Sequence, residues 1–249
     1  MEKENILGVD VCVATYDTLR ESICKNMENK EKSFLVAINP EKILKARRDK
    51  ELLQLLNRAT YQIPDGIGAV YASKLQNGKI RERITGIDSM EMLCELATEK
   101  GFRIFLYGAR REVVTAAKEK LEQQYPGIQI VGFMDGYQQD DQVVIDAINR
   151  SCADIIFVAM GSPKQENWIV DNMSQVSGVI FQGVGGSFDV ISGNVKRAPK
   201  WMQKLGLEWF YRLLKDPRRI VRQIKLIQFL GLALFVRDKN NKQLEKRNF

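Results

Sequence analysis

Short apolar runs alternate with longer amphipathic segments between residues 103 and 182, and this alternation constrains the fold most. Four runs have the length and apolar character of buried strands: residues 103–107, 128–133, 154–160 and 178–182. Segments of helical pattern separate them, which predicts right-handed β–α–β crossovers and a parallel sheet. We therefore expect an α/β fold with a Rossmann-like, mostly parallel sheet and helices on both faces.

The same pattern begins earlier in the chain. Residues 33–38 and 60–63 predict two more buried strands, and residues 6–15 predict an opening strand or extended pair. Helices are expected over residues 66–75 and 90–100. We assign residues 1–194 to one Rossmann-like core on this basis.

Basic charge is concentrated towards the C-terminus. The net charge is +7, yet residues 195–249 hold 15 Lys and Arg against 4 Asp and Glu, so the first 194 residues carry −4. A basic, aromatic helix is predicted from Lys200 to about Lys215, and a second, largely apolar helix over residues 218–236. We expect residues 195–249 to form a helical appendage that binds an anionic surface, either membrane headgroups or nucleic acid.

The composition excludes several chemistries. No histidine is present, which excludes every histidine-based general base, catalytic triad and metal ligand. The N-terminus is charged and predicts no signal peptide, and the longest apolar run, residues 226–236, is shorter than the about 20 residues that span a bilayer. The cysteines are scattered along the sequence, form no CxxC pair, and each has apolar neighbours. We therefore expect them to be reduced core thiols of a cytoplasmic protein. They are Cys12, Cys24, Cys94 and Cys152.

Three predicted strands end in glycine-bearing loops, at residues 107–110, 160–166 and 182–189. In an open parallel sheet, ligands bind at the carboxyl ends of the strands, where glycine lets a phosphate approach the backbone. Tight turns explain each loop alone, but three in one sheet favour a phosphorylated or nucleotide ligand. None is a P-loop or a complete GxGxxG fingerprint. The candidate ligand-binding residues in these loops are Gly108, Gly161, Lys164, Gln165, Glu166 and Gly185.

A further strand ends at residues 132–137. Tyr137 is suited to stacking on a nucleobase, and Asp135 to binding a ribose or a base edge. The alternative is an Asp-Gly turn with a packing tyrosine.

A lone carboxylate, Asp65, follows the strand at residues 60–63, between Pro64 and Gly66. It is either the cap of the next helix or a general base aimed into a cleft. Asn39 follows the strand at residues 33–38 in the same way. Its amide could hold a sugar hydroxyl, or cap the helix that Pro40 begins.

Two groups of arginines are candidates for phosphate binding. Arg81 and Arg83 share one face of an extended segment, which suits a diphosphate clamp, although solvated surface arginines explain the pair as well. In the appendage, Arg212, Arg219 and Arg222 recur at helical spacing. That pattern fits either a membrane-surface helix or a docking helix with a solvated basic face.

Together, these motifs resemble the WecG/TagA/CpsF family of bacterial glycosyltransferases over about residues 5–235. The likeness is closest to the TagA branch, which transfers N-acetylmannosamine from UDP to undecaprenyl-diphosphate-linked N-acetylglucosamine in wall teichoic acid synthesis. The matching motifs are Asn39-Pro40-Glu41, Pro64-Asp65-Gly66-Ile67-Gly68, Arg83-Ile84-Thr85-Gly86, Tyr107-Gly108, Gly132-Phe133 with Gly136-Tyr137, Gly161-Ser162-Pro163-Lys164-Gln165-Glu166, and Val184-Gly185-Gly186-Ser187-Phe188-Asp189.

The resemblance implies an inverting transfer that needs neither a metal nor a cofactor. In keeping with this, no acidic pair at a predicted strand end is suited to holding Mg²⁺. Asp65 would deprotonate the acceptor hydroxyl, Arg83 would neutralise the leaving diphosphate, and Gln165 and Asn39 would place the donor sugar.

The resemblance also implies two roles for the appendage. Its arginines would complete the site from above, and its apolar and basic surface would attach the chain to the inner face of the cell membrane. Self-association is another way to bury that apolar surface when no membrane is present.

One position departs from the family pattern. Ala37 stands where members often carry threonine, which leaves the donor sugar open among UDP-linked N-acetylmannosamine, N-acetylglucosamine, glucose and a uronic acid. A different class of hypothesis is a non-enzymatic nucleotide- or nucleic-acid-binding module. The apolar run at residues 226–236 favours a membrane over a nucleic acid as partner.

Overall fold

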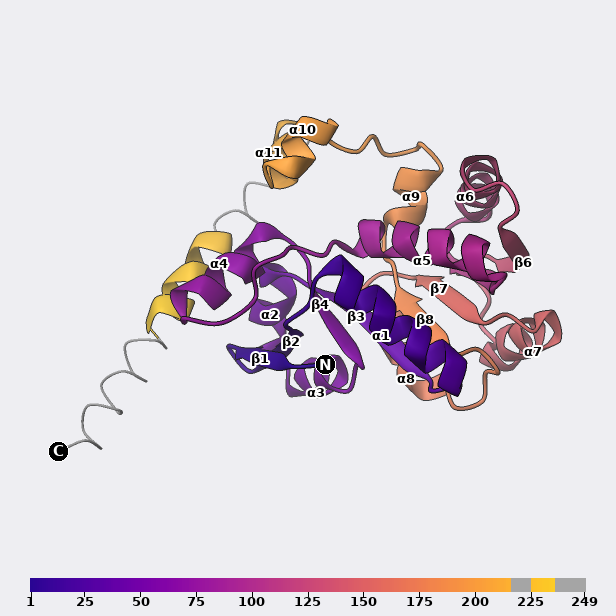
Figure 1. The fold of residues 1–249 in the computed structure, drawn as a ribbon, viewed down its shortest axis with the longest axis horizontal. Helices are drawn as coiled ribbons and strands as arrows, with labels where there is room; N and C mark the ends of the chain where they lie inside the picture. The colour runs from indigo at the N-terminus through magenta and orange to yellow at the C-terminus, as the bar shows by residue number, and fades with distance from the viewer. Residues whose placement is uncertain (216–224, 236–249) are drawn as a thin grey trace.

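The structure is a computed structural model that describes residues 1–215 and 225–235 (Figure 1). Its centre is a six-stranded sheet in the order β4-β3-β8-β7-β5-β6, and every neighbouring pair is parallel. The predicted parallel α/β fold is therefore confirmed. The strands are β3 (Ser33–Ile38), β4 (Tyr61–Pro64), β5 (Arg103–Gly108), β6 (Gln129–Met134), β7 (Ile155–Ala159) and β8 (Ile180–Gly183).

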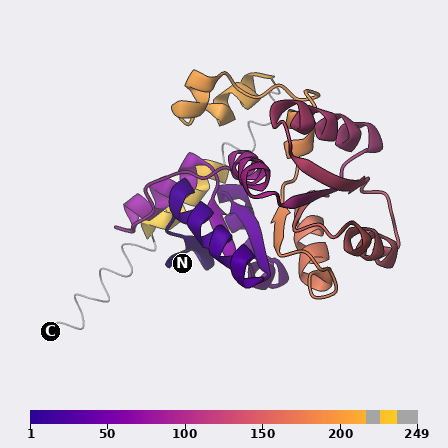
Figure 2. The ribbon, with the colours of Figure 1, turned by 45° about the vertical axis from the view of Figure 1, so that its right-hand side comes forward.

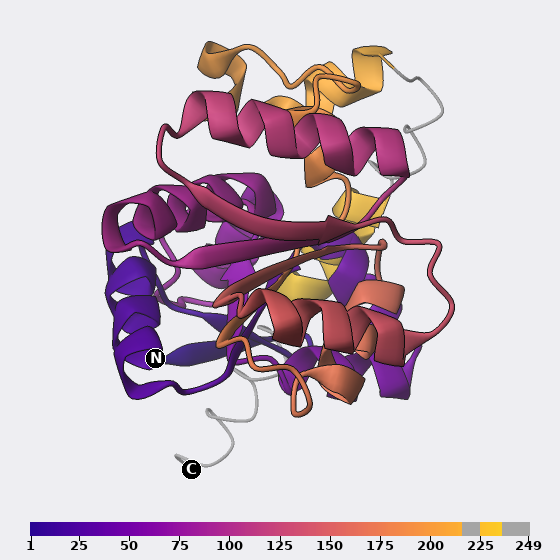
Figure 3. The same cartoon turned by 90° about the vertical axis from the view of Figure 1, so that its right-hand side faces the viewer.

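Helices cover both faces of this sheet (Figure 3). The alternation of side chains along each strand explains why, since Ile155 and Phe157 of β7 face one apolar cluster while Ile156 and Val158 face the other. One face is covered by α1 (Tyr16–Asn29), α5 (Gly86–Lys100), α6 (Arg111–Gln124) and α9 (Ser187–Ile191). The other face is covered by α2 (Pro40–Ala46), α3 (Lys50–Asn57), α7 (Asp141–Ser151) and α8 (Lys164–Asn172).

The N-terminal residues form the extended pair that the sequence predicts. Strands β1 (Lys3–Ile6) and β2 (Val9–Cys12) pair antiparallel as a separate two-stranded sheet. The buried side chains of Ile6, Val9 and Val11 join the same apolar cluster as α2 and α3, whereas Cys12 belongs to the cluster on the other face. The hairpin therefore extends the core beyond β4.

The first appendage helix is not continuous, contrary to prediction. It is split into α10 (Lys200–Lys204) and α11 (Glu208–Lys215). Gly206 has φ +71, a left-handed conformation that interrupts a helix, and the Leu207 N–H bonds back to the Met202 carbonyl at 2.8 Å. The prediction missed this break because the residues on both sides of Gly206 favour a helix.

Residues 225–235 form another helix, which runs beside α4 (Ile67–Leu75) in Figure 1 and Figure 2. Phe229 and Ala233 are fully buried in the cluster that contains β3 and α2. A side chain at Gly68 would come within 2.4 Å of Pro40 and 2.9 Å of Leu226, so glycine permits this close packing. One face of the apolar run thus belongs to the core, while Ile227 and Phe235 remain exposed.

The cysteines only partly match their predicted surroundings. All four are free thiols, and Cys12 and Cys94 are buried in the core. Cys24 is half-buried, whereas Cys152 is exposed at the C-terminal end of α7, with φ +52. The expectation of a core thiol is wrong for Cys152, because the apolar residues around it in sequence point into the sheet while it ends a helix.

Candidate active site

The sheet changes its winding direction between β5 and β7. The chain leaves β5 through α6 on one face, and leaves β7 through α8 on the other. Neighbouring parallel strands whose connections diverge in this way leave a crevice at their carboxyl ends, which is where open α/β sheets bind ligands. The topology alone therefore marks this edge as a candidate site.

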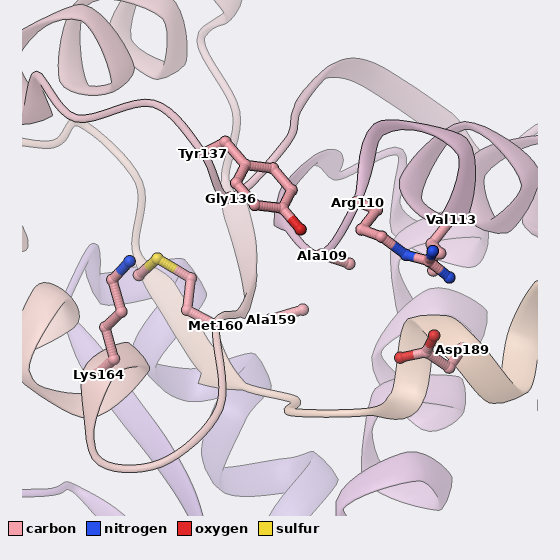
Figure 4. A pocket seen from close by; sticks show the side chains of 9 residues that line it. All are labelled: Ala109, Arg110, Val113, Gly136, Tyr137, Ala159, Met160, Lys164 and Asp189. Atoms are coloured by element: carbon pink, nitrogen blue, oxygen red, sulfur yellow. The ribbon is translucent and has the colours of Figure 1, made fainter.

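A cavity of about 260 Å³ occupies that crevice (Figure 4). In Figure 4, Arg110 and Asp189 lie on one side of it, and Lys164 and Met160 lie across from them. Its lining comes from the ends of β5, β6 and β7 and from helices α6, α8 and α9: Ala109, Arg110, Val113, Gly136, Tyr137, Ala159, Met160, Lys164 and Asp189.

Glycine holds the loops of this cavity close together. Gly108 has φ +115, and a Cβ at this position would lie 2.5 Å from the Ala159 carbonyl oxygen. The Gly136 N–H donates to the Ala109 carbonyl at 2.9 Å. The turn explanation for Gly108 therefore holds, and it coexists with a place at the edge of the cavity.

Tyr137 and Asp135 have separate roles in their loop. The Asp135 carboxylate accepts a hydrogen bond from the Tyr137 N–H at 3.0 Å, which is the turn offered as an alternative to ligand binding. The Tyr137 ring does not pack against the protein as that alternative supposed, since it is 70% exposed beside the cavity. It is available to stack on a flat ligand.

Two charged cavity residues, Arg110 and Asp189, were not among the predicted site residues. Arg110 is the N-cap residue of α6, and Lys164 is the first residue of α8, whose N-cap residue is Pro163. Neither helix has a side-chain cap. Two uncapped helix N-termini and two cations therefore border the cavity, an arrangement that attracts anions. The position of Arg110 directly after the Gly108 loop was the signal that would have identified it.

Asn39 and Asp65 lie together at a second part of the same sheet edge. Ile38 and Pro64 are paired in register, so the next residue of each strand emerges side by side, and the Asp65 N–H donates to the Ile38 carbonyl at 2.8 Å. The Asn39 side chain accepts from the Lys42 N–H at 2.9 Å, which confirms its capping role at α2. The N-cap residue of α4 is Gly66, with φ +88, rather than Asp65.

The predicted arginine pair has diverging partners. Arg81 donates to the carbonyls of Gly78 and Ile80 within its own loop. Arg83 reaches the appendage, where it donates to the Gln203 carbonyl at 3.1 Å and lies 3.3 Å from the Glu208 carboxylate. The two guanidinium groups do not converge on one point in this structure.

Arg83 belongs to a largely buried ionic cluster between the core and the appendage. The Glu208 carboxylate also lies 3.2 Å from Arg197, which lies 2.5 Å from the Asp88 carboxylate on α5. Burial raises the pKa of the nearby Glu91 carboxyl, and the Asp88 charge raises it further against the opposing effect of Arg197. The cluster attaches α11 to the loop between α4 and α5 and to the first turn of α5.

Gln165 and Glu166 are buried below the loop that follows β7. Gln165 is 3% exposed and its side-chain oxygen accepts from the Gly185 N–H at 3.0 Å. Glu166 has no exposed surface and is paired with Lys42 at 2.8 Å. In the described state, the Gln165 side chain contacts the Gly185 loop, its backbone N–H contacts the Gly161 carbonyl, and Glu166 contacts Gln165 and Lys42. Neither side chain lines the cavity.

The appendage contacts the start of α4, next to the Asp65 loop, at two places. Gly206 packs against Ile67, and Leu226 packs near Gly68. The backbone of Arg212 lies within α11, whereas Arg219 and Arg222 lie outside the described residues. The assignment of residues 195–249 as a separate unit, like the roles of these arginines, stays a prediction.

The described ranges, 1–215 and 225–235, contain neither a metal-binding cluster nor a membrane-spanning helix. No three acidic or cysteine side chains come together there in a way that could hold a metal ion. No helix in those ranges is long and apolar enough to cross a membrane. The predicted metal independence rests on the resemblance and stays a prediction.

Comparison with known proteins identifies the family of this chain. The model of the "Glycosyl transferase WecG/TagA/CpsF family" matches residues 4–243. The chain belongs to this family. It is 40% identical over 216 residues to the N-acetylglucosaminyldiphosphoundecaprenol N-acetyl-beta-D-mannosaminyltransferase of Bacillus subtilis (strain 168). The matched region covers 87% of this chain and 84% of the relative. A protein of the same name from Bacillus spizizenii is 38% identical over 208 residues, covering 84% and 81%. The predicted family is confirmed, and the chain is a glycosyltransferase.

The ionic cluster predicts a large effect of removing Glu208. The substitution Glu208→Ala leaves Arg83 and Arg197 without their shared carboxylate in a largely buried position, so we expect a loss of about 3 kcal/mol in the free energy of unfolding. Urea denaturation of the full chain measures this loss.

The matched control is Glu122→Ala, which breaks the more exposed Lys118–Glu122 pair within α6. We expect a change below about 0.5 kcal/mol there. Equal effects of the two substitutions would show that the cluster does not anchor the appendage.

Proposed function

We propose that this glycosyltransferase moves N-acetylmannosamine from its UDP-linked form to undecaprenyl-diphosphate-linked N-acetylglucosamine, with inversion at the anomeric carbon and without a metal. The observation that carries the proposal is the similarity to two Bacillus enzymes that are named for this acceptor and this sugar. The alternative of a non-enzymatic nucleic-acid-binding module is set aside by the family membership.

The cavity after β5, β6 and β7 supports a nucleotide donor. Its volume of about 260 Å³ is close to that of a small ligand pocket, and Tyr137 offers an exposed aromatic face for a uracil ring. Arg110, Lys164 and the uncapped N-termini of α6 and α8 supply positive charge for the diphosphate. These groups stabilise the charge that builds on the leaving UDP.

The second part of the sheet edge supports the chemistry at the acceptor. Asp65 takes the proton from the acceptor hydroxyl, and the resulting oxygen attacks the anomeric carbon from the face opposite UDP. Asn39, beside Asp65, uses its side-chain oxygen in capping α2, and among the described residues its amide N–H groups stay available for a sugar hydroxyl. In the described state Arg83 is paired with Glu208, so its predicted charge-neutralising role requires that pair to open.

The acceptor's lipid places the reaction at a membrane surface. Three exposed apolar side chains lie along α10 and α11, Trp201, Leu205 and Leu214, each at least 60% exposed. A basic helical segment with exposed apolar side chains is suited to the interface of an anionic bilayer. We propose peripheral attachment to the inner face of the cell membrane through this segment; self-association through the same surface stays a prediction.

The decisive experiment is a transfer assay with purified full chain, a short-chain lipid-diphosphate N-acetylglucosamine acceptor and a panel of UDP-sugars. We expect UDP-N-acetylmannosamine to give the highest kcat/KM among the N-acetylmannosamine, N-acetylglucosamine, glucose and uronic acid donors. A higher value for another donor would contradict the proposed sugar while leaving the reaction class in place, and Ala37 would be the first residue to vary.

In the same assay, Asp65→Asn tests the proposed base. The amide cannot accept the acceptor proton, so we expect kcat to fall by at least about 100-fold, while the dissociation constant for UDP, measured by calorimetry, changes little. The control Asp171→Asn removes an exposed carboxylate from α8 and should leave both values unchanged. Near-normal turnover of Asp65→Asn would exclude the base assignment.

Membrane attachment is tested by flotation with anionic liposomes. Because Phe229 is buried in the core, deleting the appendage would disturb the fold, so point substitutions are the better probe. The triple variant Trp201→Ser, Leu205→Ser, Leu214→Ser should lower binding by about tenfold or more, since each side chain loses apolar area available to the interface. Val143→Ser, at an exposed apolar position on α7, is the control. Unchanged flotation of the triple variant would rule out this surface.

A further inference from the structure

A buried chain of polar contacts joins the two parts of the site. The Lys42 ammonium donates to the Glu166 Oε1 atom at 2.8 Å, and the Gln165 Nε2 atom donates to that same oxygen at 3.2 Å. The other end of the Gln165 amide, Oε1, accepts from the Gly185 N–H at 3.0 Å. The chain therefore runs from α2, through the first turn of α8, to the loop after β8.

Both ends of this chain are attached to residues of the proposed site. Lys42 lies in the first turn of α2, where its own N–H bonds to Asn39, the residue beside Asp65. Gln165 lies in the first turn of α8, where its N–H bonds to the Gly161 carbonyl at 2.9 Å. A shift of either helix would therefore be transmitted across the sheet edge.

The charges in this chain fix the direction of an amide. A carboxylate oxygen only accepts hydrogen bonds, so Glu166 requires the Nε2 end of Gln165 to face it and leaves the Oε1 end for the Gly185 N–H. The side chain is also held tightly against β8, since a Cβ at Gly183 would lie 2.6 Å from Gln165 Nε2. Gly185 itself has φ +53, so its loop has a conformation that the amide contact stabilises.

Stability alone does not account for this arrangement. The Lys42 side chain is 12% exposed and that of Glu166 is fully buried, and the second carboxylate oxygen, Oε2, has no hydrogen-bond partner among the described residues. Apolar residues of similar volume commonly replace such a buried pair without loss of stability. The pair therefore has a use that an apolar pair would not serve, namely orientation of the groups it contacts.

We propose that Lys42 and Glu166 are positioning residues for the transfer reaction. They hold the Gly161 and Gly185 loops, on the donor side, at a fixed place relative to Asn39 and Asp65, on the acceptor side, and neither touches the substrate. This inference rests on the proposed function. It predicts that the pair controls kcat rather than the binding of UDP, because none of its members lines the cavity.

The test compares an apolar replacement with a polar one in the full chain. The double variant Lys42→Met/Glu166→Leu fills the same space with uncharged side chains, but it removes the Glu166 oxygen that accepts a hydrogen bond from Gln165. We expect its thermal midpoint and its UDP dissociation constant to stay near the wild-type values, while kcat falls about tenfold or more. Glu166→Gln keeps an acceptor oxygen, so it should retain more of kcat than Glu166→Leu. Lys118→Met/Glu122→Leu, which removes the more exposed pair on α6, is the control.

The outcomes separate the alternatives. A double variant with normal kcat and a normal thermal midpoint would overturn the positioning role and leave a structural ion pair only. If the double variant does not fold, the comparison of Glu166→Gln with wild type decides, because a purely structural role predicts that kcat follows the folded fraction. Wild-type protein without transfer from any UDP-sugar would instead count against the proposed function.

Discussion

All six strands of the central sheet run in the same direction, and the arrangement of the site follows from this constraint. Parallel strands bring every strand-to-helix loop to one edge, so residues as distant in sequence as Asn39, Asp65, Tyr137 and Gly185 lie along the same edge. The crossover helices then determine where the edge opens. Between β5 and β7 the connections diverge to opposite faces, and the cavity lies at that point.

The charges at this edge are divided between two uses. Arg110 and Lys164 are exposed at the cavity, while Arg83 and Arg197 are largely buried against carboxylates from α5 and α11. Within residues 1–215 and 225–235, the two exposed cations have no ion pair to break when a ligand binds, whereas the buried arginines must exchange a partner. In the described state, Arg110 and Lys164 are therefore suited to anion binding, while Arg83 and Arg197 attach the appendage to the core. The strong positive charge of the C-terminal segment therefore includes residues that hold the fold together.

The fold was largely predictable because its signals are local. Apolar runs, helix caps such as Asn39, and glycine loops specify elements within a few residues, and the parallel sheet follows from their order. Long-range partners were not predictable. Glu208 pairs with Arg83, and Lys42 with Glu166, across 125 and 124 positions that no spacing rule relates. The break at Gly206 and the burial of Phe229 were also missed, because sequence propensity favoured a long helix and a free apolar surface.

Strand β8 is the last strand of the described residues, yet it lies in the middle of the sheet, between β3 and β7. During synthesis, β3 with β4 and β5 with β6 and β7 are complete before the strand that joins them exists. Until residue 183 is available, each group has an unpaired inner edge, and the final pairing must close a loop of more than a hundred residues back to β3. Insertion of β8 thus completes the sheet and brings the two parts of the site together in the same late step of folding. The site therefore cannot form before β8 has paired with β3 and β7.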